Sequence, residues 1–217
     1  MKKFIIISLY LISISNCFAK NIDNIFYYGG ELGYSRVKDY TNEISKNFTD
    51  QFGGSVTISQ NSNVNDLRFF SGLNINKYFD IELGISATDE IKMSIYGKTK
   101  DGTNYSGQLT SYYGGLDYSA ILKPFADNTL KNLYFRIGAT YFINNDEITA
   151  RASNSSANVN IYSTEDKSGT GYILGLGYNF PIDETLTFRA SWTHLGKIAG
   201  ISKNYSNRIS IGLLEKF

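Results

Sequence analysis

The single histidine of this 217-residue sequence, His194, is the side chain best suited to acid–base chemistry near neutral pH. In a hydrolytic site it would activate a nearby serine and be oriented by a carboxylate. Position 196 is Gly, and the next acidic residue along the chain is Glu215, at the far end of the last predicted strand. We therefore expect His194 to be an interfacial residue beside Trp192, and a lipid-modifying enzyme that depends on His194 is the alternative.

Other residues that could take part in catalysis or metal binding lack the partners that they would need. The serines between 153 and 157 have no histidine nearby, and the pairs Asp146-Glu147 and Asp183-Glu184 lack the further oxygen ligands of a calcium loop. The only cysteine, Cys17, excludes a disulfide framework. We predict no catalytic, cofactor-binding or metal site, and a net charge of +1 gives no reason to expect nucleic acid as a partner.

The first nineteen residues have the composition of a signal peptide. Lys2 and Lys3 are followed by an apolar run from Phe4 to Ile14, and Cys17 and Ala19 are small residues suited to a cleavage site. The run is shorter than the ~20 residues that a membrane-spanning helix needs. We predict a signal peptide at 1–19 and one domain, exported through the periplasm, at 20–217.

The rest of the chain alternates apolar and polar residues in eight segments, which predicts eight β-strands. In the fifth segment, for example, Phe135 and Ile137 flank Arg136. The predicted strands cover residues 24–36, 66–76, a segment from 79, a segment ending near 122, 133–142, 170–180, 185–195 and 205–217.

The links between these strands alternate in length. Those near 76–79, 123–132 and 181–184 are short to moderate, whereas those near 37–65, 89–105, 143–169 and 196–204 are long and polar. Short turns at one end and long loops at the other are typical of outer-membrane barrels. The alternation of Ile91, Met93 and Ile95 also predicts that two strands extend to a hairpin turn at Asp101-Gly102.

The charged residues on the polar faces decide which way the strands face. They lie near the middle of seven strands, where lipid contact would cost about 2–4 kcal/mol for an arginine. We therefore predict that they line a sealed, ion-paired interior, with Glu31 between Arg68 and Arg208, Glu82 beside Arg68, and Asp117 beside Arg136. This predicted interior network comprises Glu31, Arg68, Glu82, Asp117, Arg136, Arg189 and Arg208.

Aromatic residues on the opposite, apolar faces support a membrane setting. Many stand near strand ends, where interfacial aromatic girdles form. They are Tyr28, Tyr34, Tyr112, Tyr118, Tyr141, Tyr178, Phe180, Trp192 and Phe217. The predicted fold is an all-β, eight-stranded antiparallel up-and-down transmembrane β-barrel whose narrow interior is filled by side chains.

The chain ends with apolar residues at alternate positions and a terminal Phe. Ile209, Ile211, Leu213 and Phe217 look like the signal that the barrel-assembly machinery reads, although Glu215 stands where an aromatic residue is common. Together with residues 26–34 (FYYGGELGY) and 190–196 (ASWTHLG), this pattern resembles the OmpA-like outer-membrane β-barrel superfamily, porin-like surface antigens included.

The resemblance implies a location in the outer membrane of a Gram-negative bacterium, among its lipids and lipopolysaccharide. The expected function is a non-enzymatic surface barrel whose polar loops contribute to envelope structure, adhesion or antigenicity, with a host or surface ligand as a possible partner. A small low-conductance channel is a further alternative beside the lipid-modifying enzyme.

Overall fold

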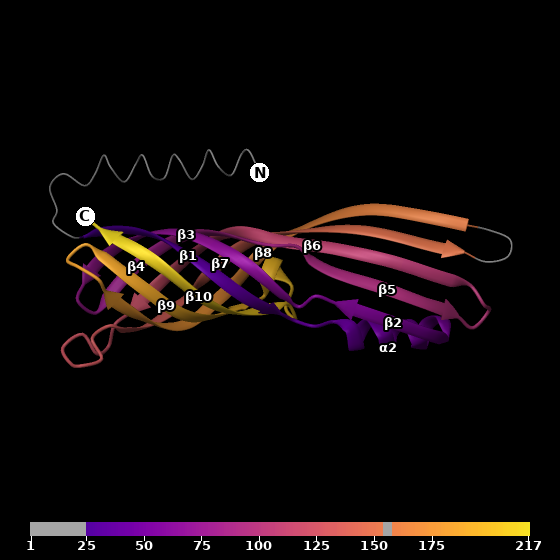
Figure 1. Ribbon diagram of the computed structural model, residues 1–217, viewed down its shortest axis with the longest axis horizontal. Helices are drawn as coiled ribbons and strands as arrows, with labels where there is room; N and C mark the ends of the chain where they lie inside the picture. The colour runs from indigo at the N-terminus through magenta and orange to yellow at the C-terminus, as the bar shows by residue number, and fades with distance from the viewer. Residues whose placement is uncertain (1–24, 154–157) are drawn as a thin grey trace.

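The computed structural model describes residues 25–153 and 158–217, so the predicted signal peptide lies outside the described part of the chain. Ten antiparallel strands, one α-helix and one short 3-10 helix make up the described fold (Figure 1). The strands are β1 (Phe26–Val37), β2 (Gly54–Gln60), β3 (Asn63–Asn76), β4 (Phe79–Thr88), β5 (Ile91–Thr99), β6 (Asn104–Leu122), β7 (Leu133–Ser153), β8 (Asn158–Pro181), β9 (Leu186–Gly196) and β10 (Tyr205–Lys216).

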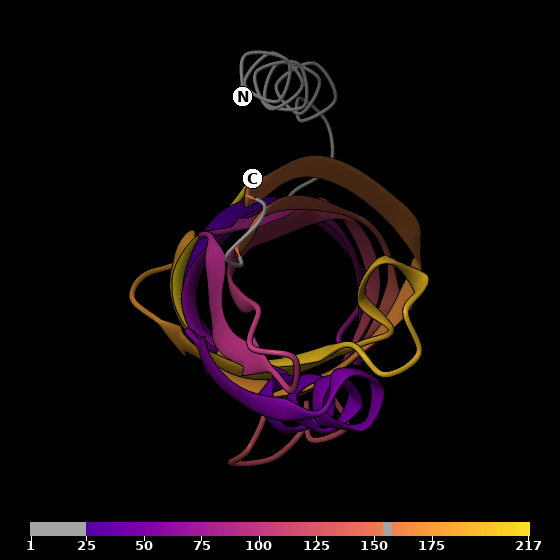
Figure 2. The same ribbon diagram turned by 90° about the vertical axis from the view of Figure 1, so that its right-hand side faces the viewer.

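Eight of the strands close into a ring, which confirms the predicted barrel (Figure 2). The order around it is β1-β3-β4-β6-β7-β8-β9-β10, and β10 pairs with β1 to complete the circle. Barrel strands that follow one another along the chain are thus hydrogen-bonded neighbours in the ring. Both ends of the barrel chain lie at the short-turn end, where the amide of Phe217 donates to the carbonyl of Phe26 (2.9 Å).

The barrel is polar inside and apolar outside, as the alternation predicts. Leu32 is 65% exposed and Ile209 is 66% exposed, whereas Glu31 and Arg208 beside them in the sequence are each 2% exposed. This polarity is the reverse of that in a water-soluble barrel and suits a wall that faces acyl chains. Aromatic side chains remain exposed toward both ends of the wall, including Tyr28, Tyr118 and Phe180 at one end and Tyr34, Tyr141 and Trp192 at the other.

Two of the links predicted as long loops are in fact regular structure. Residues 143–153 and 158–169 belong to β7 and β8, which pair with each other here as the two arms of a long hairpin, and residues 37–65 contain helix α2 (Thr41–Phe52) and strand β2. The predicted extension at 89–105 is confirmed, because β5 and β6 pair up to the turn that contains Gly102 at φ +89°. Beyond the barrel rim, β2, β5 and the outer halves of β6, β7 and β8 form what we call the extracellular sheet (Figure 1).

The link predicted as a loop at 196–204 contains η1 (Ile198–Gly200), whose Ile198 and Ala199 belong to a buried apolar cluster. Ile198 is fully buried and Ala199 nearly so. Lys197 and Ala199 have positive φ angles of 55° and 53°, which gives this link its tight course. This link is therefore packed against the barrel wall rather than a free loop.

Candidate functional site

All seven residues of the predicted interior network lie inside the barrel, each at most 4% exposed. Arg68 of β3 is at their centre. Its guanidinium lies 2.8 Å from Asp117, 3.2 Å from Glu82 and 3.5 Å from Glu31. Alternation along β3 turns this side chain inward, between carboxylates supplied by β1, β4 and β6.

The other arginines contact the same carboxylates, Arg136 and Arg208 from neighbouring strands and Arg189 from across the interior. Arg136 lies 2.6 Å from Asp117, and Arg189 lies 2.6 Å from Glu82. Arg208 lies 3.8 Å from Glu31, so Glu31 stands between Arg68 and Arg208.

Two buried carboxylates, Asp66 and Asp80, were missed by the sequence prediction, and Asp80 is 5% exposed and lies 2.7 Å from Lys123. Asp66 is 6% exposed, lies 3.2 Å from Arg208 and accepts a short hydrogen bond from Ser35. The alternation that turns Arg68 inward also turns Asp66 inward, so extending that pattern to the start of the strand would have found it. With Asp66, four carboxylates face four guanidinium groups, and the network has no net formal charge.

Apolar layers close the interior on both sides of the charges. Toward the periplasmic end, Tyr27, Phe70 and Leu214 form a buried cluster, and the guanidinium carbon of Arg68 lies 4.6 Å from the centre of the Phe70 ring. Toward the mouth, a larger buried cluster contains Val37, Val64, Tyr113, Phe142, Ile173, Leu195, Ile198 and Ala199. The charged network between two apolar clusters makes the interior a packed core.

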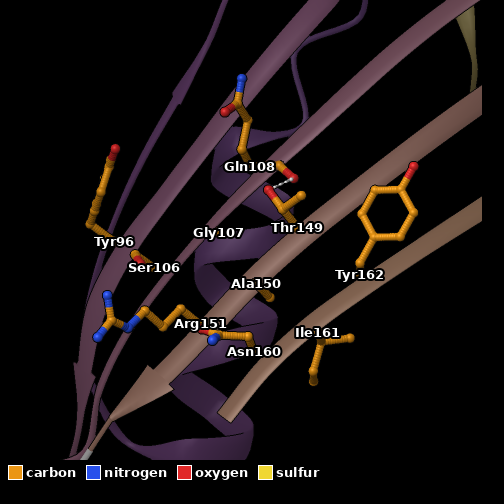
Figure 3. Close-up of a pocket in the computed structure, with 10 residues that line it drawn as sticks. All are labelled: Tyr96, Ser106, Gly107, Gln108, Thr149, Ala150, Arg151, Asn160, Ile161 and Tyr162. Carbon is orange, nitrogen blue, oxygen red and sulfur yellow. Dashed lines mark hydrogen bonds between the residues drawn. The ribbon is translucent and has the colours of Figure 1, made fainter. Parts of the chain in front are cut away.

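Broad hollows open on the outer side of the described structure, among them one on the extracellular sheet and one at the barrel mouth. The larger, of about 470 Å³, spans β5 to β8 (Figure 3). Thr149 donates a hydrogen bond to the backbone carbonyl of Gln108 within it (3.4 Å). Its lining residues are Tyr96, Ser106, Gly107, Gln108, Thr149, Ala150, Arg151, Asn160, Ile161 and Tyr162. The smaller, of about 270 Å³, lies at the barrel mouth between Tyr40, Met93, Tyr113 and Ile201.

Helix α2 is tied to the mouth by charge and to the sheet by an aromatic contact. Glu43 lies 3.2 Å from Lys203 and 3.4 Å from Lys38. The hydrogen bond from Lys203 is the main cause that lowers the pKa of the Glu43 carboxyl below its ordinary value. The ring centres of Phe48 and Tyr105 lie 4.3 Å apart. These contacts hold the helix beside β2.

His194 lies on the outer surface of β9 among aromatic residues, as expected. Its ring stands 5.8 Å from the rings of both Tyr172 and Tyr205, and its Nδ1 is 2.9 Å from the amide oxygen of Asn207. Nε2 lies 3.5 Å from the hydroxyl of Tyr172. An amide and a phenol surround this imidazole, an arrangement that lacks the carboxylate and serine of a hydrolytic triad.

The residues of the predicted assembly signal are on the outside of β10. Ile209, Ile211 and Leu213 are 51–66% exposed, and the ring of Phe217 stacks on Tyr28 at 4.8 Å. Among residues 25–153 and 158–217, no cluster of three or more His, Cys, Asp or Glu is arranged to hold a metal ion. No helix in the same part of the chain is long and apolar enough to cross a membrane.

A ring of eight strands with a lipid-facing apolar wall and an ion-paired interior defines a transmembrane β-barrel of the outer membrane of Gram-negative bacteria. The chain belongs to the OmpA-like transmembrane domain family, whose sequence model matches residues 21–217.

Comparison with solved structures finds outer-membrane barrels at low sequence identity. Ail of Yersinia pestis, solved with the heparin analogue sucrose octasulfate, is 11% identical with a TM-score of 0.43, covering 90% of this chain and 100% of that one. CarO2 of Acinetobacter baumannii is 15% identical with a TM-score of 0.45, covering 91% and 100%. Neisserial surface protein A is 15% identical with a TM-score of 0.39, covering 88% and 97%. No curated protein matches the chain.

Proposed function

We propose that this protein is a non-enzymatic surface barrel that holds a rigid extracellular sheet away from the membrane for contact with a host or surface ligand. The observation that carries the proposal is the sheet itself. The part of β8 from 158 to 171 extends beyond its pairing with β9, and the twelve residues 158–169 form its outer stretch. At about 3.3 Å per residue they reach roughly 40 Å along the strand direction. A barrel that served only as a membrane plug would not need this structure.

The sealed interior supports a scaffold role rather than transport. Four arginines and four carboxylates neutralise one another between two apolar clusters. Such a core fixes the wall that carries the sheet. The surroundings of His194 favour an interfacial role, and its replacement by Ala should leave the lipid profile of the envelope unchanged. A changed profile would favour the lipid-modifying alternative.

The proposed partners during assembly follow from the membrane setting. Lipopolysaccharide would surround the outer half of the wall, and the assembly machinery would read Ile209, Ile211, Leu213 and Phe217. A Phe217→Ser variant should insert poorly in cells and yet refold normally in micelles. Equal insertion of variant and wild type in cells would remove this role.

The contact role is tested by shortening the β7–β8 hairpin. Asn145 and Asp166 face each other in the register, so residues 146–165 can be replaced by an Asn-Gly turn. The shortened barrel should keep its heat-modifiable migration on gels, but cells that carry it should lose adhesion to cultured host cells and labelling by antibodies raised against the folded protein. The matched control shortens the periplasmic link 123–132 and should retain both. Undiminished adhesion and labelling after removal of the hairpin would refute the proposal.

A further inference from the structure

The outer half of β8 has a partner strand on one side only. β7 pairs with it from Asn158 onward, whereas β9 begins to pair at Tyr172. Near the barrel rim η1 closes the open side, since a Cβ added at Gly169 would stand 2.7 Å from the Cα of Gly200. Within the described part of the chain, residues 158–168 thus present one row of backbone amides and carbonyls to the surroundings.

The opposite edge of the extracellular sheet, strand β2, is flanked. Helix α2 runs directly into β2 through Gly53 and lies beside it in both views (Figures 1 and 2). The Tyr105 hydroxyl also donates to the carbonyl of Ser55 (3.3 Å). Covering an edge with a helix is a common way to prevent strand addition. The β8 edge has no such cover among the described residues.

The composition of the β8 edge is that of a strand open to pairing. Residues 158–164 read Asn-Val-Asn-Ile-Tyr-Ser-Thr, without charge, Pro or Gly. Val159 is 51% exposed, Ile161 is 56% exposed and Tyr162 is 67% exposed. Natural edges are usually blocked by Lys, Pro or a bulge, and here charge begins only at Glu165.

We propose that residues 158–164 are a docking edge for an extended segment of another polypeptide, presented from outside the cell. Only a strand satisfies a row of alternating backbone donors and acceptors, and added strands gain specificity through alternate side chains. The segment would carry apolar residues at every second position to continue the face of Val159 and Ile161. This inference rests on the proposed contact function and names the class of partner.

A second copy of the chain in the same membrane does not fit this edge. Both copies would be oriented alike, so their β8 strands would run in the same direction. A two-fold axis along the membrane normal would then place identical residues level with each other. In a parallel pair, a residue whose N–H and C=O point at the partner strand lies level with a partner residue whose N–H and C=O point away. In the symmetric pair, two identical residues at the same level would both point at each other, so parallel pairing cannot form. The occupant is therefore a different polypeptide.

The test uses the full-length barrel in nanodiscs and an acetylated, amidated, fluorescent peptide with the sequence of residues 54–60. That sequence suits the edge, because Val56 and Ile58 supply apolar residues two positions apart, as the proposed segment requires. We expect saturable binding at up to millimolar peptide, with slowed hydrogen exchange at alternate amides of 158–164. Two control peptides carry N-methyl groups at alternate residues, each on one of the two alternating sets of amides. The control peptide whose methylated amides face β8 should bind at least tenfold more weakly than the unmethylated peptide.

Two variants locate the site. Ile161→Lys should weaken peptide binding at least tenfold, whereas Thr149→Lys should not, because Thr149 lies opposite Tyr162 on the inner neighbour strand β7. Unchanged exchange at 145–153 would show that the hairpin of the Ile161 variant is intact. Protection elsewhere, equal binding of both N-methylated peptides, or dimerisation without peptide would overturn the inference. If the shortened hairpin abolishes cell adhesion but Ile161→Lys does not, the docking edge fails while the contact function stands.

Discussion

The barrel interior and the extracellular sheet use the same charged residue types in opposite ways. Inside, the eight charged side chains of the interior network are each at most 6% exposed and share contacts across seven strands. On the sheet, ion pairs are local and open to water, as between Lys92 and Glu90 at 2.9 Å or Lys167 and Glu165 at 3.0 Å. Buried charges without a partner are costly, whereas exposed pairs contribute little. Charge therefore fixes the wall and leaves the sheet free to vary.

The largest expected difference between the two regions is in the cost of losing one arginine. Arg68→Met should lower the free energy of unfolding by about 3–5 kcal/mol, because Glu31, Glu82 and Asp117 lose a buried partner. Arg151→Met, on the exposed sheet, should change it by less than about 0.5 kcal/mol. Urea unfolding in micelles, followed by heat-modifiable migration, measures both. Equal losses in the two variants would show that the interior network is not the source of rigidity.

A second contrast concerns apolar packing. Phe142 in the mouth cluster is 1% exposed, so Phe142→Ala should lower the free energy of unfolding by about 3 kcal/mol. Ile161→Ala, more than half exposed, should cost far less. Neither variant should conduct ions in planar bilayers, because the charged layer beneath Phe142 still fills the interior. Stepwise conductance in the wild type would instead favour the channel alternative.

The interior was predictable because two simple rules act together there. Alternation decides which residues face inward, and an up-and-down ring makes successive strands neighbours, which places Glu31 between Arg68 and Arg208. The contact of Arg189 with Glu82 joins β9 to β4, which are not neighbours in the ring. It depends on the width of the interior, which the order of residues along the chain does not specify.

The extracellular sheet was harder to predict for a physical reason. Outside the membrane neither face of a strand must be apolar, so segments such as Asn144 to Glu147 lose the period-two contrast that marks a spanning strand. Helix α2 had a weak signal, with Ile44 and Phe48 four residues apart on one side of an otherwise polar segment. Its contact with Tyr105 comes from a strand that begins about fifty residues later.

A smaller effect tests how the helix is attached to the sheet. A Cβ added at Gly97 would lie 1.9 Å from the hydroxyl of Tyr105, so Gly97→Ala must displace the ring on which Phe48 packs. Hydrogen exchange within residues 41–52 should become faster, at a cost of about 1 kcal/mol or less. Gly107→Ala is the control, because its nearest neighbour, the carbonyl oxygen of Thr149, would be 3.3 Å away. Equal exchange in both variants would contradict the role given to Tyr105.

The smallest expected effect is the response of the helix to acid. The lowered pKa of Glu43 means that its ion pairs with Lys38 and Lys203 stabilise the docked helix at pH values above the ordinary glutamate range. That contribution should be lost as the pH falls through the lowered pKa, and exchange in residues 41–52 should then accelerate relative to the sheet. Screening limits the effect for so exposed a group.

A Glu43→Gln variant separates this acid response from general loosening of the sheet. It cannot lose a charge, so exchange in its helix should be faster than in the wild type near neutral pH and should show no further acceleration over the acidic range. The barrel offers the internal reference, because strands held by the interior network should keep their protection in both proteins over the same range. If the wild-type helix and the Glu43→Gln helix respond to acid alike, Glu43 does not tether α2, and other contacts, among them that of Phe48 with Tyr105, position the helix.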